Sequence, residues 1–416
     1  MTEVKDAVVC VVGLGYVGWP LAVAMARHAA VIGYDSNPDK VSRLASEAGS
    51  GRLEVTADAA SIGRADYVII CVPTPVAADK QPDLSDVIGA AAVVGRHLKQ
   101  GATVILESTV YPGVTEEVVK PVLEKESGFR CGRDFRLAYS PERMNPGDEI
   151  HGLENITKIV GGADEATTRD VAALYGTVVA GVHIAPDIKT AEAAKVIENI
   201  QRDINIALVN EFAMLFSRLG IDTGEVLRAA ETKWNFHAYR PGLVGGHCIP
   251  VDPYYLVHKA REAGYEPQVI LAGRAINDSM PDYVVAEVCR ELTAAGHEVA
   301  GARVLIMGLT YKENVPDTRE SPAKKLIEAL QKRGVTALGY DPVLEDGRSF
   351  SVELLPGLEG LTGINSVIYT VAHRTFDNIG LARLRAVCTE KPVLFDVRGY
   401  FTAGDARQAG FIYRSL

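Results

Sequence analysis

The pattern of apolar and polar positions predicts a chain in which buried parallel strands alternate with helices. Residues 7–12 (AVVCVV) form a continuous apolar run with β-branched residues, which is typical of a strand buried on both faces. A glycine-rich turn follows, then a helical pattern over 17–27 and a strand-like run over 30–34. The alternation continues with a strand, a helix, a strand and a helix at 67–72, 84–98, 103–107 and after Pro112. Such alternation predicts an α/β domain built on a parallel sheet.

The turn after the first strand carries a dinucleotide-binding fingerprint, Gly13-Leu-Gly15-Tyr-Val-Gly18, and the second strand ends at Asp35. In such a loop the first glycine makes a tight turn, the second admits a pyrophosphate and the third lets helix and strand pack closely. Asp35 would bind the adenosine ribose and repel a 2′-phosphate, so we expect NAD rather than NADP. The cofactor contacts predicted from this loop and the later strand ends are Gly13, Gly15, Tyr16, Val17, Gly18, Asp35, Pro73, Thr74, Ser108 and Thr109.

A second α/β pattern begins near residue 302 and lacks a full glycine fingerprint. Its strands are expected at 303–308, 335–340, 366–371 and 393–396, with a helix after Pro322. Two nucleotide-type halves indicate two nucleotide-bearing ligands, a dinucleotide in the first half and a different one in the second.

A long helix is predicted between the two halves, from an N-cap at Asp187 to a stop at Gly220. At about 1.5 Å per residue it would span roughly 45–50 Å, which is more than one domain needs. Its apolar stripe is expected to comprise Ile197, Ile200, Ile204, Leu208, Phe212, Leu215 and Leu219. We expect this helix to join the domains and to pack against a partner subunit in a homodimer. The predicted fold is therefore α/β, with two Rossmann-like doubly wound domains joined by a long central helix, divided as 1–186, 187–300 and 301–416.

Polar residues on this helix are the first candidates for chemistry. Lys195, Asn199 and Arg202 share one face, which taken alone favours an ordinary solvated face of an amphipathic helix. Two other segments change this interpretation. The stretch 140–143 (SPER) follows a strand-like run, and 241–253 is a Gly- and Pro-rich loop around Cys248, where a cysteine is poorly placed to fill a core.

Composition narrows the class of protein. The 416 residues carry a net charge of −10, which argues against nonspecific binding to nucleic acid or to a membrane surface. Six cysteines without a C-x-x-C pair argue against a disulfide framework and a structural zinc site. A metal site around His247 and Cys248 fits no common ligand spacing, so no metal is expected. No apolar stretch reaches about 18 residues, and a cytoplasmic protein is expected.

Six motifs, in order, resemble the UDP-glucose/GDP-mannose dehydrogenase family over essentially the whole chain. They are GLGYVG (13–18), STV-PG (108–113), SPER-NPG (140–147), the helix with Lys195 and Asn199, GGHC (245–248) and YKENVPDTRESP (311–322). The resemblance implies a four-electron oxidation of a sugar C6 alcohol to the acid with two NAD⁺ and no metal. A cysteine serves this chemistry because its addition to the intermediate aldehyde restores an oxygen that can expel a second hydride.

The resemblance also implies roles for individual residues. The catalytic set is Cys248, Lys195, Asn199, Asp252, Glu142 and Thr109. Cys248 would be the nucleophile, and Lys195 with Asn199 would stabilise the oxyanion. Asp252 would orient a water or tune Lys195, Thr109 would hold the same water, and Glu142 would be the base for hydrolysis.

The implied substrate contacts are Glu142, Arg143, Lys195, Arg202, Phe236, Arg240, Gly245, Tyr311, Lys312 and Arg319. A guanidinium suits bidentate phosphate contact, although Arg143 fits a structural ion pair equally well. Val251 stands where UDP-glucose dehydrogenases usually carry lysine, and this resembles the branch acting on UDP-N-acetylhexosamines. We expect UDP-N-acetylglucosamine as substrate, for surface polysaccharide biosynthesis, with UDP-N-acetylmannosamine, UDP-N-acetylgalactosamine and UDP-glucose as alternatives.

Two other functions fit part of the sequence. A single-step dehydrogenase of the 6-phosphogluconate or 3-hydroxyacid type would also use Lys195 and Asn199, but it leaves Cys248 and the second nucleotide-type half unexplained. An NAD-sensing binding protein would predict losses among Lys195, Asn199, Cys248 and Asp252, and all four are present.

Overall fold

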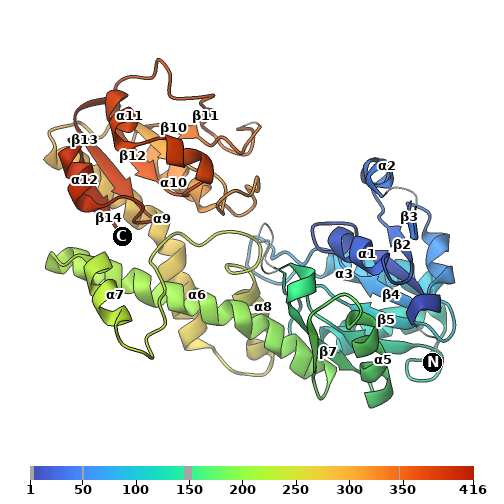
Figure 1. Ribbon diagram of the computed structural model, residues 1–416. Helices are drawn as coiled ribbons and strands as arrows, with labels where there is room; N and C mark the ends of the chain where they lie inside the picture. Colours follow the sequence, from blue (N-terminus) through green and yellow to red (C-terminus); the bar gives the residue numbers. More distant parts are fainter. Residues whose placement is uncertain (1–3, 49–50, 145–151, 346) are drawn as a thin grey trace. The chain divides into compact units, whose positions relative to one another are not determined.

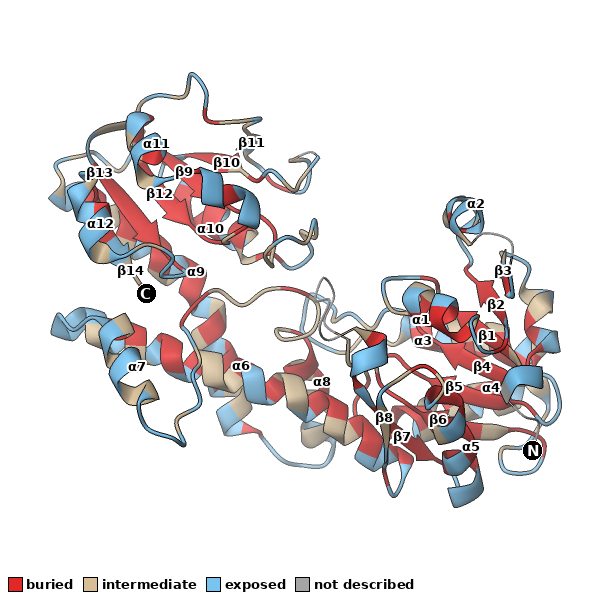
Figure 2. Cartoon of the chain, in the orientation of Figure 1, coloured by how far each residue is buried: buried red, intermediate tan, exposed pale blue. Residues whose placement is uncertain are grey.

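The computed structural model describes residues 4–48, 51–144, 152–345 and 347–416 (Figure 1). The chain divides into two compact units, residues 1–199 with 251–266, and residues 200–250 with 267–416. The end of the SPER-NPG motif, 145–147, lies outside the described residues. In each unit the strands are mostly buried beneath helices whose outer faces are exposed (Figure 2). The predicted division into three domains remains a prediction.

The first unit contains one large twisted sheet. Its strands, within the described residues, are β1 (Val8–Val12), β2 (Ala30–Tyr34), β3 (Leu53–Thr56), β4 (Tyr67–Ile70), β5 (Thr103–Leu106), β6 (Arg136–Tyr139), β7 (Thr157–Gly162) and β8 (Gly181–Ile184). They lie in the order β3-β2-β1-β4-β5-β6-β7-β8. Only the β6–β7 pair is antiparallel among them. The first six follow the doubly wound order that places a ligand at the carboxyl ends of β1 and β4.

Helices cover both faces of this sheet. They are α1 (Gly18–Met25), α2 (Pro38–Glu47), α3 (Ser85–His97), α4 (Lys120–Ser127), α5 (Glu165–Tyr175) and α8 (Asp252–Glu262). Side chains of α3 and α4 pack on one face, and those of α1 and α5 pack on the other. Because both faces are covered, β4 and β5 are buried at every position, which explains their continuous apolar runs.

The second unit repeats the same strand order on a smaller scale. Its described strands are β9 (Arg303–Met307), β10 (Thr336–Tyr340), β11 (Glu353–Leu354), β12 (Ile364–Tyr369), β13 (Cys388–Asp396) and β14 (Ile412–Ser415). They are parallel, in the order β11-β10-β9-β12-β13-β14. The helices of this unit are α7 (Thr223–Glu231), α9 (Gln268–Ala294), α10 (Pro322–Gln331), α11 (Leu381–Ala386) and α12 (Ala403–Gln408). Helices α9 and α10 pack on one face of the sheet, and α11 and α12 pack on the other.

The long helix is α6 (Ile188–Leu219), and the two units divide within it. Asp187 accepts the Thr190 N–H at 2.7 Å, and Gly220 adopts φ +68°, so both predicted ends are confirmed. The predicted α/β fold with two Rossmann-like sheets and a long helix is confirmed. No helix in the described ranges is long and apolar enough to cross a membrane.

The burial of the two faces of α6 differs from what the sequence pattern predicts. Lys195 is only 8% exposed, so the polar face at this end of the helix is not solvated, although Arg202 is exposed. The apolar stripe is instead about half exposed at Ile197, Leu208, Leu215 and Leu219. On this face Asn199 donates to Asp252, which begins α8 later in the chain and belongs to the same first unit.

Candidate functional site

The glycine-rich loop fits a bound dinucleotide. Gly13 has φ +93°, and its N–H donates to Tyr34 O at 2.8 Å. A Cβ on Gly18 would lie 1.9 Å from Gly13 O, so close packing of the chain requires this glycine. A Cβ on Gly15 would meet nothing within 4 Å. The protein's own packing therefore requires the first and third glycines, while the second faces space where a pyrophosphate can approach the backbone.

Asp35 is buried at the carboxyl end of β2, beside this loop. Its carboxylate accepts the Leu14 N–H at 2.9 Å, the Asn37 N–H at 3.0 Å and Lys40 Nζ at 2.8 Å. Burial acts to raise the pKa of Asp35, but these donors outweigh it and hold the pKa below its usual range. Asp35 is thus an ionised acceptor in the position expected for ribose binding. Lys40, which offsets part of its charge, is absent from the residues that the sequence predicts.

The other predicted cofactor contacts follow two neighbouring strands. Pro73 and Thr74 come after β4, and Ser108 and Thr109 come after β5. Ser108 Oγ donates to Val72 O at 2.6 Å, which ties the two loops together. Since β1, β4 and β5 are adjacent and parallel, these loops share one edge of the sheet with the glycine loop.

Lys195, Asn199 and Asp252 form a buried cluster in the first unit. Asn199 Nδ2 donates to Asp252 Oδ2 at 2.5 Å, and Asp252 is 3% exposed. Burial raises the pKa of Asp252 to about 6, against the lowering effects of the Lys195 charge and the Asn199 hydrogen bond. An ammonium and an amide donor on one helix face can stabilise an oxyanion. A carboxyl that titrates near neutral pH can exchange protons with a substrate or a water.

Glu192, one turn before Lys195 on α6, fixes the loop that carries Thr109. Its carboxylate accepts the Gly113 N–H at 2.5 Å and the Thr115 N–H at 2.9 Å, and its side chain is fully buried. It thereby ties the start of the π-helical turn η3 (Thr115–Val119) to the helix that bears Lys195. Glu192 is absent from the residues that the sequence predicts. Its spacing of three from Lys195 on one helix face is the signal that could have found it.

The stability of the protein should depend on pH through Glu192. Burial raises the pKa of this carboxyl from 4.5 to about 7, mainly by desolvation. The folded state then binds a proton that the unfolded state has released, so stability falls as pH rises from about 4.5 to about 7. We expect Glu192→Gln to remove this pH dependence, which amounts to a change of roughly 3 kcal/mol in the free energy of unfolding. Melting temperatures of both proteins across this range test it, with Glu165→Gln on the exposed surface of α5 as control. Parallel curves for wild type and Glu192→Gln would contradict the assignment.

The SPER segment rests on a buried ion pair. Lys158, in the buried strand β7, pairs with Glu107 and donates to Pro141 O at 2.8 Å. Tyr175 also donates to the Glu107 carboxylate. Glu142 uses one carboxylate oxygen to accept the Met144 N–H, whereas its Oε2 is buried and accepts no hydrogen bond from the described residues. An unsatisfied buried carboxylate oxygen is well suited to accept a proton from a water.

Arg143 forms an ion pair, which is the structural role expected as the alternative to substrate binding. Its guanidinium lies 2.7 Å from the Glu198 carboxylate and also donates to Thr157 O. Both partners belong to the first unit, so these contacts fix the end of the SPER segment against α6 and β7.

The Cys248 loop lies against the YKENVPDTRESP motif within the second unit. A Cβ on Gly245 would be 2.5 Å from Pro322 Cδ and 2.9 Å from Glu320 O, so only glycine permits this approach. The His247 and Tyr311 rings lie 5.7 Å apart, edge to face. Two motifs more than 60 residues apart in sequence are therefore brought together. All six cysteines, Cys248 included, are thiols that form no disulfide.

A buried polar network anchors the base of this loop. Asn210 on α6 accepts the Gly242 N–H at 2.8 Å and donates to Gly242 O at 3.0 Å. It also donates to Asn277 at 2.9 Å, and Asn277 donates to Asp203, which pairs with Arg274 at 2.6 Å. Helices α6 and α9 together thus hold the chain six residues before Cys248.

Two of the basic residues predicted to contact the substrate, Arg319 and Arg240, already have acidic partners. Arg319 makes a bidentate pair with Asp317, and its NH2 group lies 3.3 Å from His247 Nε2. Arg240 is exposed and pairs with Glu231. The predicted Lys312 and Phe236 are partly exposed.

Arg398 is a further candidate for binding the substrate, and it is absent from the residues that the sequence predicts. It follows β13, pairs with Glu313 at 3.0 Å and lies 3.6 Å from where a Gly242 Cβ would be. A basic residue just beyond a buried strand is the signal that could have found it.

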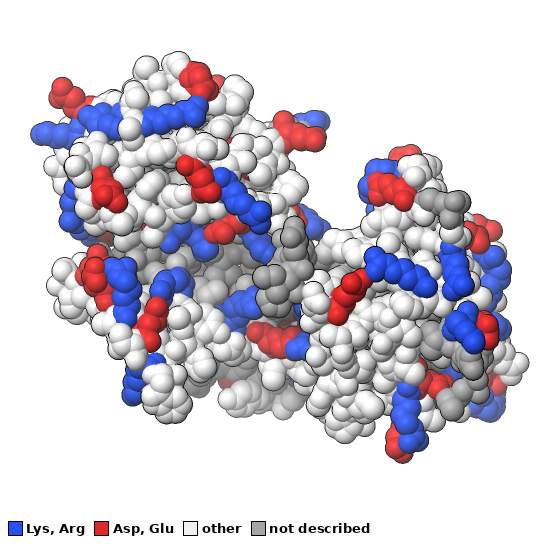
Figure 3. Space-filling model, viewed as in Figure 1, with Lys and Arg blue, Asp and Glu red and all other residues white. Residues whose placement is uncertain are grey.

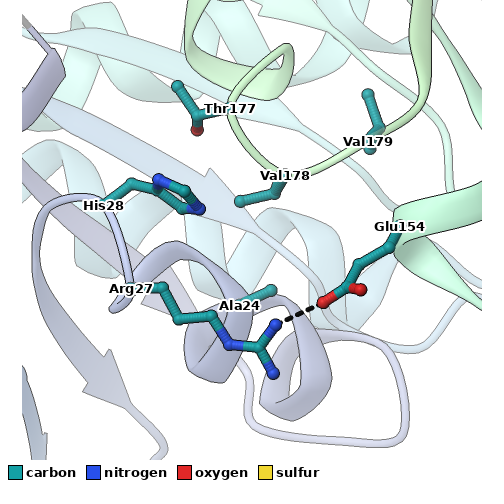
Figure 4. A pocket seen from close by; sticks show the side chains of 7 residues that line it. All are labelled: Ala24, Arg27, His28, Glu154, Thr177, Val178 and Val179. Atoms are coloured by element: carbon teal, nitrogen blue, oxygen red, sulfur yellow. Dashed lines mark hydrogen bonds and ion pairs between the residues drawn. The ribbon is translucent and has the colours of Figure 1, made fainter.

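A small pocket on the surface of the first unit is separate from the candidate cofactor site. It lies at the C-terminal end of α1, between Arg27, His28, Glu154 and residues 177–179, with Arg27 paired to Glu154 (Figure 4). The glycine loop is at the opposite end of α1, so this pocket is not the dinucleotide site.

On the face shown in Figure 3, the described basic and acidic side chains are interspersed on the surface of each unit. Within the described ranges, no group of three or more His, Cys, Asp or Glu has metal-binding geometry.

Models of the three domains of one protein family match the chain. The NAD binding domain of the UDP-glucose/GDP-mannose dehydrogenase family matches residues 44–179, its central domain matches 189–279 and its UDP binding domain matches 305–403. Protein CapL of Staphylococcus aureus is 44% identical, covering 98% of this chain and 99% of its own length.

Two further relatives carry the names of enzymes. UDP-N-acetyl-D-glucosamine 6-dehydrogenase of Pseudomonas aeruginosa is 44% identical over 95% of this chain and 97% of its own. The solved structure of a UDP-D-ManNAc dehydrogenase from Pyrococcus horikoshii has a TM-score of 0.88 and 31% identity, covering 98% of this chain and 99% of its own. The predicted resemblance is confirmed: the chain belongs to the UDP-glucose/GDP-mannose dehydrogenase family, as a nucleotide-sugar dehydrogenase with NAD as its cofactor.

Proposed function

We propose that the protein oxidises the C6 alcohol of UDP-N-acetylglucosamine to the carboxylate. The observation that carries this proposal is the 44% identity, over 95% of the chain, with the Pseudomonas enzyme of that name. Val251, in place of the lysine usual in UDP-glucose dehydrogenases, supports an N-acetylated sugar. The product would serve surface polysaccharide biosynthesis in the cytoplasm.

The chemistry proceeds in two oxidations. The alcohol first loses a proton and a hydride to become an aldehyde. The Cys248 thiolate then adds to the aldehyde carbon, giving a thiohemiacetal whose oxygen can expel a second hydride. The resulting thioester is opened by water, which releases the carboxylate and regenerates the thiol. NAD⁺, when bound, accepts the hydride in each oxidation.

The buried cluster of the first unit serves these steps. Four peptide units separate Cys248 from Asp252, so their Cα atoms are at most about 15 Å apart. Lys195 and Asn199 donate to the oxygen that becomes an oxyanion, and the Lys195 charge favours the thiolate. Asp252 and Thr109 hold the water, and Glu142 removes its proton through its unsatisfied Oε2.

The remaining predicted residues bind the two ligands. The cofactor is held by the glycine loop, Asp35 and the loops after β4 and β5. The UDP-sugar is held in the second unit by Tyr311, Lys312, Arg319 and Gly245, with Arg202, Phe236 and Arg240 as further contacts. Arg319 must exchange its pairing with Asp317 for a phosphate contact. The half-exposed apolar stripe of α6 supports a homodimer formed along this helix.

UDP-N-acetylmannosamine is the second candidate substrate. The likeness to the Pyrococcus UDP-D-ManNAc dehydrogenase structure favours it, at the lower identity of 31%.

A panel of UDP-sugars tests the substrate. We expect kcat/KM for UDP-N-acetylglucosamine to exceed the values for UDP-N-acetylmannosamine, UDP-N-acetylgalactosamine and UDP-glucose by at least about 10-fold, because a polar site rejects a misplaced hydroxyl or a missing acetamide. Product analysis should show the uronic acid in each productive reaction. A higher kcat/KM for any other sugar would refute the substrate assignment, and a reaction mixture without enzyme serves as the blank for background NADH.

A further inference from the structure

The two units share a structural detail at their first strands. Gly13 directly follows strand β1 and Gly308 directly follows strand β9, and they adopt φ +93° and +91°. Each glycine donates its N–H to a tyrosine carbonyl on the neighbouring strand, Tyr34 at 2.8 Å and Tyr340 at 2.9 Å. The turn that binds a dinucleotide in the first unit therefore has a close equivalent in the second.

The acids that follow these tyrosines are equivalent but differ in environment. Asp35 accepts the Leu14 N–H at 2.9 Å, and Asp341 accepts the Leu309 N–H at 2.6 Å. Beside Asp35 is the partly exposed Lys40 side chain. Asp341 is instead covered by His373, whose Nε2 lies 3.2 Å from Asp341 Oδ2, and both side chains are fully buried. The second acid is thus enclosed within the protein.

The contacts of His373 indicate which of its two ring nitrogens accepts a hydrogen bond and which donates one. The Asn314 N–H donates to His373 Nδ1 at 2.9 Å, so Nδ1 carries no proton. Thr310 Oγ1 donates to Lys312 O at 3.0 Å and lies 3.2 Å from His373 Nε2. Nε2 therefore bears the hydrogen and donates to the Asp341 carboxylate and the Thr310 oxygen. The ring joins an acid at the end of β10 to the far end of a loop.

That loop is the segment that presents Tyr311 and Lys312. Its last residue, Asn314, has φ +60°, a conformation that costs energy outside glycine and must be held by neighbours. Two consecutive residues hold it, because His373 accepts the Asn314 N–H and the Arg374 N–H donates to Asn314 Oδ1 at 2.9 Å. At the other end, Asp341 accepts the N–H groups of Leu309 and Thr310. His373 and Asp341 together therefore fix both ends of the loop.

We propose that His373 is a positioning residue for the UDP-sugar: it holds the Leu309–Asn314 loop in the conformation that presents Tyr311 and Lys312. This inference rests on the proposed function for the identity of the ligand. It also assigns Asp341 an internal role, so Asp341 does not bind a ribose as Asp35 is proposed to do.

Three variants of His373 test this role. His373→Ala removes the contacts of both ring nitrogens. His373→Asn restores an acceptor near the Nδ1 position, and His373→Gln restores a donor near the Nε2 position. His297→Asn, at a half-buried histidine of the same unit, is the matched control. The probes are UDP alone and NAD⁺, each titrated by calorimetry into the full-length protein, together with the melting temperature.

We expect His373→Ala to raise the Kd for UDP by about 10-fold or more, since the loop must then be ordered on binding. The Kd for NAD⁺ should stay within about 2-fold, because the glycine loop belongs to the other unit. His373→Asn should recover most of the UDP affinity and His373→Gln less. With UDP-N-acetylglucosamine, KM should rise while kcat at saturation is kept.

The inference is overturned if His373→Ala and His373→Asn both bind UDP as tightly as wild type. It is equally overturned if the variants lose NAD⁺ and UDP affinity together, in step with the melting temperature, because that pattern indicates a general structural role. If His373→Ala does not fold, the comparison of His373→Asn with His373→Gln decides the question. A wild type that binds UDP but does not oxidise UDP-N-acetylglucosamine refutes the proposed substrate and leaves the UDP-binding result for His373 intact.

Discussion

Cys248→Ala should abolish acid formation, lowering the rate of the complete oxidation by at least about 10³-fold. The first hydride can leave with the help of the alcohol oxygen, but the aldehyde has no hydroxyl at C6 that could help a second hydride to leave. Without the thiol no thiohemiacetal forms, so the second hydride has no group to expel it. The variant should therefore stop at the aldehyde, and mass spectrometry of the products should show no thioester and no uronic acid.

Two comparisons separate chemistry from folding in this experiment. NAD⁺ affinity should be unchanged in Cys248→Ala, because the glycine loop and Asp35 lie in the other unit. Cys289→Ala, at a partly buried cysteine packed against the core of the second unit, should oxidise the substrate at the wild-type rate. Normal acid production by Cys248→Ala would show that the nucleophile has been assigned wrongly.

Lys195→Met should lower kcat by about 10²–10³-fold with a smaller change in KM, which is the usual cost of losing one oxyanion donor. Methionine fills a similar volume, so the buried face of α6 should still pack. The change also removes the charge that lowers the pKa of Asp252, so that pKa should rise above its value of about 6. If Asp252 acts as a carboxylate, the acid limb of the pH–rate profile should then move to higher pH.

Lys189→Met is the matched control for this variant. Lys189 lies on the same helix but is half exposed and pairs with Glu117. Its loss should leave kcat and the pH–rate profile unchanged. A Lys195→Met enzyme with a wild-type kcat, or with an unmoved acid limb, would contradict the role given to this lysine.

Local patterns predicted much of the fold. The continuous apolar runs at β1, β4 and β5 indicate strands covered by helices on both faces, because the apolar side chains on each face must be buried. The ends of α6 were predictable because Asp187 and Gly220 act on their own backbone within a few residues. What the pattern could not show is which face of α6 is buried. Asn199 on the Lys195 face donates to Asp252 on α8, which follows it by more than 50 residues, and helical periodicity carries no information about such a partner.

The candidate site was predictable only where motifs marked it. The Gly245 loop and Tyr311 are together in the structure; Gly and Pro density marked the loop, and family resemblance pointed to Tyr311. The motifs do not include the supporting residues Glu192, Lys158 and His373. Each is a fully buried polar residue, and its function comes from backbone groups that folding brings to it. Such contacts depend on tertiary structure, which a local pattern does not encode.

The stoichiometry of the wild-type reaction tests the central claim most directly. With UDP-N-acetylglucosamine as limiting substrate and excess NAD⁺, NADH is measured by absorbance and the sugar products by mass spectrometry. Oxidation through Cys248 predicts two NADH for each uronic acid and no accumulated aldehyde. One NADH per sugar consumed, with a free aldehyde or ketone as the final product, would contradict it and would instead indicate a single-step dehydrogenase.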